Sequence, residues 1–383
     1  MTEKELRDIL QMLCVTIGSR SIGTAGERRA AEYVTRRFRE FGWESRIEEY
    51  PCLAWDYEGS TAAIDGRALH AGATHYSPGG VFEGPLMRAR IGKDQLPIID
   101  DYRGRIAWYC EKEAGLFARH QVCRELRNEG AVGVLMLSYL VDTWSTKIVR
   151  EPDIGIPTFG VAGREAAVLQ ASEGRPVRLS VQAQTRPSRS GNAVATAPGG
   201  PVGPLVLVTA HHEAAPYCPG AMDNASGVAM LLAVAQRFGR SRHARRFMLA
   251  TTGGHEYGGA NTCGRGAVAL FQEHKKLFLS SGGFQLNFDG AGKREDEVIT
   301  CANFSDALLD RLRSAAVVRV RPQPFVGVDA MPWCQWKLPV MWPVSEGGSD
   351  VYHSPMDTVD RIDFAALTDA AARQCELLEK LLA

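Results

Sequence analysis

The stretch Leu205-Val-Leu-Val-Thr-Ala-His-His-Glu213 decides how we interpret this chain. An apolar, β-branched run ends in two imidazoles and a carboxylate, and a glycine-rich loop then brings Asp223 and Asn224 to the start of a helical pattern. Such a run predicts a buried strand, and its polar end would lie at the carboxyl edge of an α/β sheet. Imidazole and carboxylate groups that meet at one point are typical of a metal site.

Strand-like and helical patterns alternate from residue 192 to the end of the sequence. This alternation predicts an α/β fold, with a mixed, largely parallel sheet and helices on both faces. Residues 51–186 differ, because short strand-like runs and many glycines predict a smaller, mostly β inserted domain. We therefore expect a discontinuous domain of residues 1–50 and 187–383. The inserted part contains no cluster of ligand-type residues, so the sequence assigns no chemistry to it.

The composition argues against several classes of partner. Lys+Arg and Asp+Glu number 44 each, so the chain offers no basic field for nucleic acid or an anionic membrane. No run approaches the roughly 18 apolar residues of a membrane span. The nine cysteines form no Cys-x-x-Cys pair, which favours reduced thiols, and the charged start of the sequence has no apolar signal region. We expect a cytoplasmic protein.

Polar residues follow several of the predicted strands, where parallel strand ends can bring them together. A lone histidine is usually a hydrogen-bonded core residue and an Asp-Asn at a helix start is usually a cap, so only the joint pattern is informative. Two histidines with three carboxylates suit zinc, and also manganese or cobalt, in a paired site. The candidate residues are His211, Glu213, Asp223, His255, Glu256, Asp289, Tyr352 and His353.

In order and local context these residues resemble the co-catalytic zinc exopeptidases of metallopeptidase family 28. Five motifs of the family have counterparts in this sequence, in the same order. The first three are His-x-Asp, here His211-His-Glu213; Gly-x-Asp-Asp-Asn-x-Ser-Gly, here Gly220-Ala-Met-Asp-Asn-Ala-Ser-Gly227; and Glu-Glu-x-Gly, here His255-Glu-Tyr-Gly258. The last two are Asn-x-Asp, here Asn287-Phe-Asp-Gly290, and Tyr-His-Thr-Pro-x-Asp-Thr, here Tyr352-His-Ser-Pro-Met-Asp-Thr358. The resemblance covers about residues 1–50 and 187–383. Residues 51–186 resemble, more weakly, the protease-associated domain of family members, which implies a lid or a substrate-selecting wall.

The resemblance implies a site for two Zn²⁺, with Mn²⁺ or Co²⁺ as alternatives. Asp223 would bridge the metals, His211 and Asp289 would complete one position, and Glu256 and His353 would complete the other. It also implies that Glu213 orients the His211 ring and that Tyr352 donates a hydrogen bond to the oxyanion of the transition state.

His255 departs from the family pattern, which has Glu as the general base. A neutral imidazole can accept and return a proton, but it cannot provide a negative charge to hold a substrate ammonium. Two interpretations stay open: an active hydrolase with a histidine base, or an impaired site that still binds metal. Asp329 has two interpretations as well, a loop cap or a residue of the pocket.

The predicted function is that of a di-zinc exopeptidase, an aminopeptidase acting on short peptides, with no nucleic-acid or membrane partner. The alternatives are a carboxypeptidase, acylamino-acid or cyclase-type activity on the same site, and a metal-binding interaction protein without activity. Trp333, Trp336 and Trp342 could line a specificity pocket, although we favour core packing for them.

Overall fold

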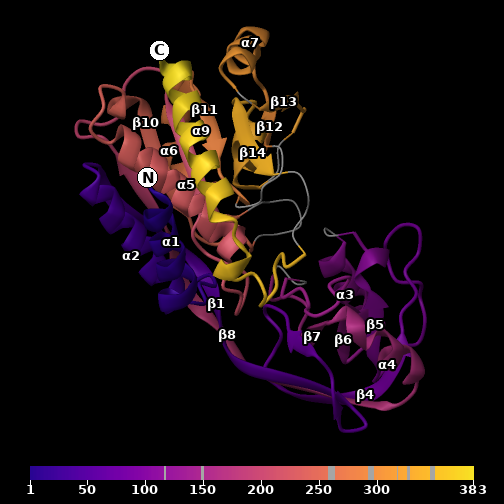
Figure 1. Ribbon diagram of the computed structural model, residues 1–383. Coiled ribbons are helices and arrows are strands. Elements are labelled where there is room, and N and C mark those ends of the chain that lie inside the picture. Colours follow the sequence, from indigo (N-terminus) through magenta and orange to yellow (C-terminus); the bar gives the residue numbers. More distant parts are fainter. Residues whose placement is uncertain are drawn as a thin grey trace.

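The computed structural model describes residues 1–115, 118–147, 151–257, 264–291, 297–316, 318–325, 328–345 and 350–383 (Figure 1). Gly258 of the His255-Glu-Tyr-Gly258 motif therefore lies outside the described residues. The helices are α1 (Glu3–Gln11), α2 (Ala25–Glu40), α3 (Arg119–Asn128), α4 (Ala166–Ala171), α5 (Ser226–Phe238), α6 (Arg265–Ser281), α7 (Asp306–Ala315), α8 (Met331–Gln335) and α9 (Phe364–Leu382). The strands are β1 (Glu44–Ile64), β2 (Arg67–Ala68), β3 (Ala71–Ala73), β4 (Gly80–Arg88), β5 (Ile106–Cys110), β6 (Gly133–Leu137), β7 (Thr158–Val161), β8 (Pro176–Thr196), β9 (Val206–His211), β10 (Phe247–Thr252), β11 (Phe284–Asn287), β12 (Glu297–Ala302), β13 (Arg319–Pro322) and β14 (Val340–Ser345).

Within the described part of the chain, the strands form one 14-stranded sheet in the order β13-β12-β14-β11-β9-β10-β8-β4-β5-β6-β7-β3, with β1 and β2 off this path. Around β9 the pairing is parallel, since β9 pairs with β10 and β11, and β11 pairs with β14 in the same sense. Strand β8 adds an antiparallel partner to β10, and β14 adds one to β12. The prediction of a mixed, largely parallel sheet is confirmed.

The residues of β9 alternate between two hydrophobic clusters, as the period of a strand requires. Val206, Val208 and Ala210 belong to the cluster that contains buried residues of α1, α2, α5 and α9. Leu205 and Leu207 belong to the cluster that contains residues of α6 and α8. Figure 1 shows α1, α2, α5 and α9 gathered on one side of the sheet. The strand is therefore buried on both faces, and the prediction of helices on both faces is confirmed.

A long antiparallel ladder of β1 and β8 leads from the main sheet into residues 51–186 (Figure 1). It runs from the pair Glu44↔Thr196 to the pair Ile64↔Val177, with a register shift between Tyr57 and Gly59. The far end of the ladder packs in a separate hydrophobic cluster with β5, β6 and β7. The predicted boundary near residues 50 and 187 falls inside this ladder, and the division into two domains stays a prediction.

The carboxyl ends of β9, β10 and β11 lie side by side, because these strands pair in parallel register. His211 is the last residue of β9, opposite Thr252 at the end of β10. His255 and Glu256 follow β10, and Asp289 follows β11. The sheet thus brings polar residues from three separate parts of the sequence to one edge.

Candidate metal centre

All five residues predicted as metal ligands lie together at this edge, and they form two groups with His255. We call His211, His255 and Asp289 the His211 group, and Asp223, Glu256 and His353 the His353 group. Within each group, one ligand atom of every residue lies within 4.8 Å of the others.

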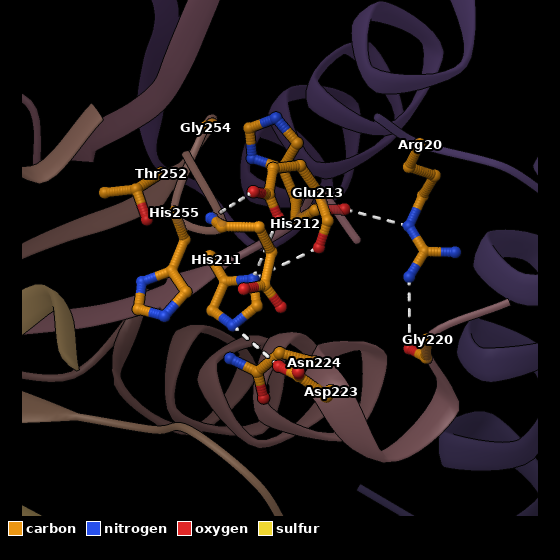
Figure 2. A network of polar contacts seen from close by, with 12 residues as sticks. Arg20, His211, His212, Glu213, Gly220, Asp223, Asn224, Thr252, Gly254 and His255 are labelled. Carbon is orange, nitrogen blue, oxygen red and sulfur yellow. Dashed lines mark hydrogen bonds and ion pairs between the residues drawn. The ribbon is translucent and has the colours of Figure 1, made fainter. Parts of the chain in front are cut away.

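Asp223 connects the two groups through its two carboxylate oxygens. Its Oδ1 lies 3.0 Å from His211 Nε2, and its Oδ2 lies 3.0 Å from His353 Nε2. Figure 2 shows the first of these contacts, with the His211 ring directed at Asp223. A carboxylate that faces two imidazoles in this way is placed to bridge two cations.

The buried polar atoms of the two groups fit bound cations. In the described residues, no hydrogen-bond partner is found for six of these atoms: His211 Nε2, Asp223 Oδ1, Asp223 Oδ2, Glu256 Oε1, Asp289 Oδ2 and His353 Nε2. Leaving so many buried polar atoms without a hydrogen bond is costly unless something else binds them. His353 Nε2 lies 3.0 Å from both Asp223 Oδ2 and Glu256 Oε1, near the separation of about 3.3 Å between the ligands of a tetrahedral zinc ion.

Glu213 contacts the ring of His211 on the side away from Asp223. His211 Nδ1 lies 3.3 Å from Glu213 Oε2 and 3.1 Å from the Glu213 carbonyl oxygen. The other carboxylate oxygen of Glu213 accepts a hydrogen bond of 2.5 Å from the backbone N–H of Glu256. With its Nδ1 proton directed at Glu213, His211 can offer the Nε2 lone pair to a metal. The structure thus brings Glu213 to the place predicted for it.

His255 lies beside His211 and is held by Asp329. The two imidazole rings are stacked, with centroids 4.1 Å apart and planes 11° apart. His255 Nδ1 lies 2.8 Å from Asp329 Oδ1, and Thr252 donates its hydroxyl hydrogen bond to the other oxygen of Asp329. Burial and the neighbouring His211 oppose protonation of His255, but Asp329 and Asp289 raise its pKa above the ordinary value. From the sequence, Asp329 is either a loop cap or a residue of the pocket, and its contact with His255 favours the second interpretation.

Residues 51–186 also reach the site, through Thr146 and Lys147, two residues that the sequence analysis did not single out. Lys147, between β6 and β7, forms a buried ion pair with Glu256 Oε2. Burial of Glu256 opposes its ionisation, but His353 and Lys147 hold the pKa of this carboxyl well below its usual range. Thr146 donates to the carbonyl oxygen of His353 from its backbone N–H, at 2.8 Å, and from its hydroxyl, at 3.2 Å.

Asp357 holds the loop that carries Asp223. It belongs to the last motif, and the sequence analysis predicted no role for it. Asp357 accepts hydrogen bonds from the backbone N–H groups of Met222, at 2.8 Å, and Asp223, at 3.0 Å. Burial raises the pKa of Asp357 to about 6. Gly220 begins the loop with φ +62°, and a Cβ there would lie 2.6 Å from the backbone oxygen of Asp223. This position therefore requires glycine.

Arg20 connects the loop after β9 with the loop that carries Asp223. Nothing in the sequence pattern singled it out. Its side chain is fully buried. It donates hydrogen bonds to the backbone carbonyl oxygens of Leu13, Gly18, His212, Pro219 and Gly220. Figure 2 shows the guanidinium between His212, after β9, and Gly220, before Asp223.

Tyr352 stands next to the His353 group, with its ring centroid 3.7 Å from that of His353. Its part in stabilising an oxyanion stays a prediction. Trp342 donates its indole N–H to the Asp289 carbonyl oxygen at 3.0 Å. Trp333 is buried against Phe271, as predicted for core packing, whereas Trp336 is 49% exposed.

Comparisons with known proteins agree with this fold. Residues 192–378 match the model of peptidase family M28. The chain is 26% identical over 256 residues to the probable lipoprotein aminopeptidase LpqL of Mycobacterium tuberculosis, which covers 63% of this chain and 49% of the relative. It is 22% identical over 394 residues to aminopeptidase YwaD of Bacillus subtilis, covering 96% and 82%. This chain thus spans about half the length of the mycobacterial relative.

Among solved structures, the zinc aminopeptidase BSAP from Bacillus subtilis superposes with a TM-score of 0.79 at 20% identity, covering 98% of this chain and 94% of that one. At 20% identity, this superposition shows that the two chains share a fold. The family match adds the order of the motifs, since residues 192–378 contain all five motifs on which the site is built. The candidate metal centre thus lies within the region, residues 192–378, that matches peptidase family M28.

Proposed function

We propose that this chain is a di-zinc exopeptidase, an aminopeptidase that removes N-terminal residues from short peptides. The observation that carries the proposal is the pair of donor groups joined by Asp223, whose two oxygens each lie 3.0 Å from a different histidine. The match of residues 192–378 to peptidase family M28 supports a peptidase, and the name of each reported relative or structure contains the word aminopeptidase.

Each metal position would be held by residues of one group, with Asp223 shared between them. Two Zn²⁺, or Mn²⁺ or Co²⁺ in their place, would supply a Lewis acid for the scissile carbonyl and a water of lowered pKa. Glu213 would keep the His211 Nε2 lone pair directed at its ligand position, as second-layer carboxylates do in metal sites.

His255 would move the proton in the reaction. Its Nε2 would accept a proton from the attacking water and return it to the leaving amine, while Asp329 keeps the other proton on Nδ1. The His255 side chain is 7% exposed and that of His211 is 1% exposed, so His255 has more access to a substrate. Tyr352 would donate a hydrogen bond to the developing oxyanion.

One observation favours a second candidate. One ligand atom of His255 lies within 4.8 Å of ligand atoms of His211 and Asp289, and the contact of His255 with Asp329 equally suits a metal-bound imidazole. In that case the site would bind metal without a general base, and the chain would be a metal-binding protein of low activity.

Substitution of His255 separates the two candidates. If His255 is the base, His255→Gln lowers kcat for aminoacyl-amide substrates by about 10²- to 10⁴-fold and leaves the bound zinc per chain unchanged. If His255 is a ligand, the zinc content falls instead. His243→Gln, in the turn before β10, is the matched control and should behave as the native chain. If the zinc-loaded chain hydrolyses no aminopeptidase, carboxypeptidase or N-acylated substrate, the proposed enzymatic activity is refuted.

The cellular location stays a prediction. In the part of the chain that the structure describes, no helix combines the length and the apolar character needed to cross a membrane. The predicted cytoplasmic location can be tested by fractionation of cells that express the chain.

A further inference from the structure

A lysine contacts the His353 group from outside the motifs of the family. Lys147 Nζ pairs with Glu256 Oε2, and the two side chains are 9% and 0% exposed. The other oxygen of the same carboxylate, Oε1, lies 3.0 Å from His353 Nε2. One oxygen of Glu256 is therefore directed at the ligand position, and the other is occupied by an ammonium.

The neighbouring residue contacts the same group. Thr146 donates to the carbonyl oxygen of His353 from both its backbone N–H and its hydroxyl. Two consecutive residues of the segment between β6 and β7 thus hold two of the three members of the His353 group. For the His211 group, the contacts described above come from Glu213, Asp329 and Trp342, which all lie within residues 187–383.

We propose that Lys147 is a positioning residue that limits Glu256 to one free oxygen and weakens metal binding at the His353 group. The inference rests on the proposed function, because it requires a metal in each group. An ammonium beside a ligand carboxylate competes with the metal for its charge, and it also repels the cation through a poorly screened, buried environment. The His211 group has no such cation among its described contacts. The two positions therefore fill in sequence, the His211 position first.

Zinc titration of the metal-stripped, full-length chain by isothermal calorimetry tests the proposal. We expect two binding steps for the native chain. In Lys147→Met, which keeps the length of the side chain and removes its charge, the weaker step should become at least about tenfold tighter, while the stronger step stays the same. Lys147→Arg should retain the weak step. Lys112→Met, the same change at an exposed lysine that also lies within residues 51–186, is the matched control and should leave both steps unchanged.

Lys147→Gln provides a second variant, because it removes the charge but keeps a hydrogen-bond donor for Glu256. Circular dichroism of each variant verifies that it is folded. An unchanged or weaker second step in both folded, uncharged variants would overturn the role of Lys147 and leave the proposed function intact. A native chain that binds no zinc would overturn the metal centre, and with it both proposals.

Discussion

The His211 group and the His353 group have similar donor atoms, but the residues that contact them differ in charge. Around the His211 group, Glu213 and Asp329 each contact an imidazole Nδ1, and both are acidic. Around the His353 group, Lys147 pairs with the Glu256 carboxylate, and Thr146 donates to the backbone carbonyl oxygen of His353. One group is thus surrounded by additional negative charge, and the other is partly neutralised by a buried cation.

This difference teaches that the two halves of a paired site need not be equivalent. Negative charge beside an imidazole strengthens it as a ligand, whereas a cation beside a carboxylate weakens the carboxylate. Lys147 and Thr146, which contact the His353 group, belong to residues 51–186. We therefore expect metal binding at this group to depend on how residues 51–186 pack against the main sheet.

Substitution of Asp223 should have the largest effect, because it removes the carboxylate that contacts both His211 and His353. In Asp223→Ala, both positions lose a carboxylate oxygen, and we expect activity to fall by roughly three orders of magnitude or more. Bound zinc per chain, measured by elemental analysis, should fall at both positions. Asp310→Ala, at an exposed position of α7, is the control. Two tightly bound zinc ions in Asp223→Ala would show that the groups bind metal independently.

Arg20 supports both groups, and its substitution should weaken them together. Arg20→Leu leaves buried carbonyl oxygens of His212 and Gly220 without their donor, so we expect the free energy of unfolding to fall by about 3–5 kcal/mol. Denaturant unfolding of the metal-free chain measures this change, with the exposed Arg36→Leu as control. A loss below about 1 kcal/mol would mean that the loops hold their positions without the guanidinium.

Asp329 should have the smallest effect of the three, confined to the His211 group. Asp329→Asn keeps the size of the side chain but removes the charge next to His255 Nδ1, and we expect kcat to fall about 10- to 100-fold. The weaker zinc-binding step, assigned to the His353 group, should not change. Equal shifts of both zinc-binding steps would contradict the independence of the two supports.

Much of the fold could be predicted from the sequence because the signals are local. The apolar run before His211 has the composition of a strand buried on both faces, and Val206 and Leu207 indeed belong to clusters on opposite faces. The candidate residues that follow the strands lie together because parallel strands carry their ends to one edge. The sequence analysis predicted no role for Lys147, or for Asp357 of the last motif. Neither a lone lysine nor an aspartate in a turn shows from the sequence which distant residues it contacts.

The sequence by itself determined the α/β architecture and the set of residues at the candidate metal centre, because hydrophobic periodicity and short motifs are properties of adjacent residues. Only the tertiary structure decided how this set is supported. Lys147 and Glu256 are 109 positions apart, and Arg20 and His212 are 192 positions apart. Such contacts depend on the packing of distant segments, which no local pattern specifies, and they distinguish the two groups from one another.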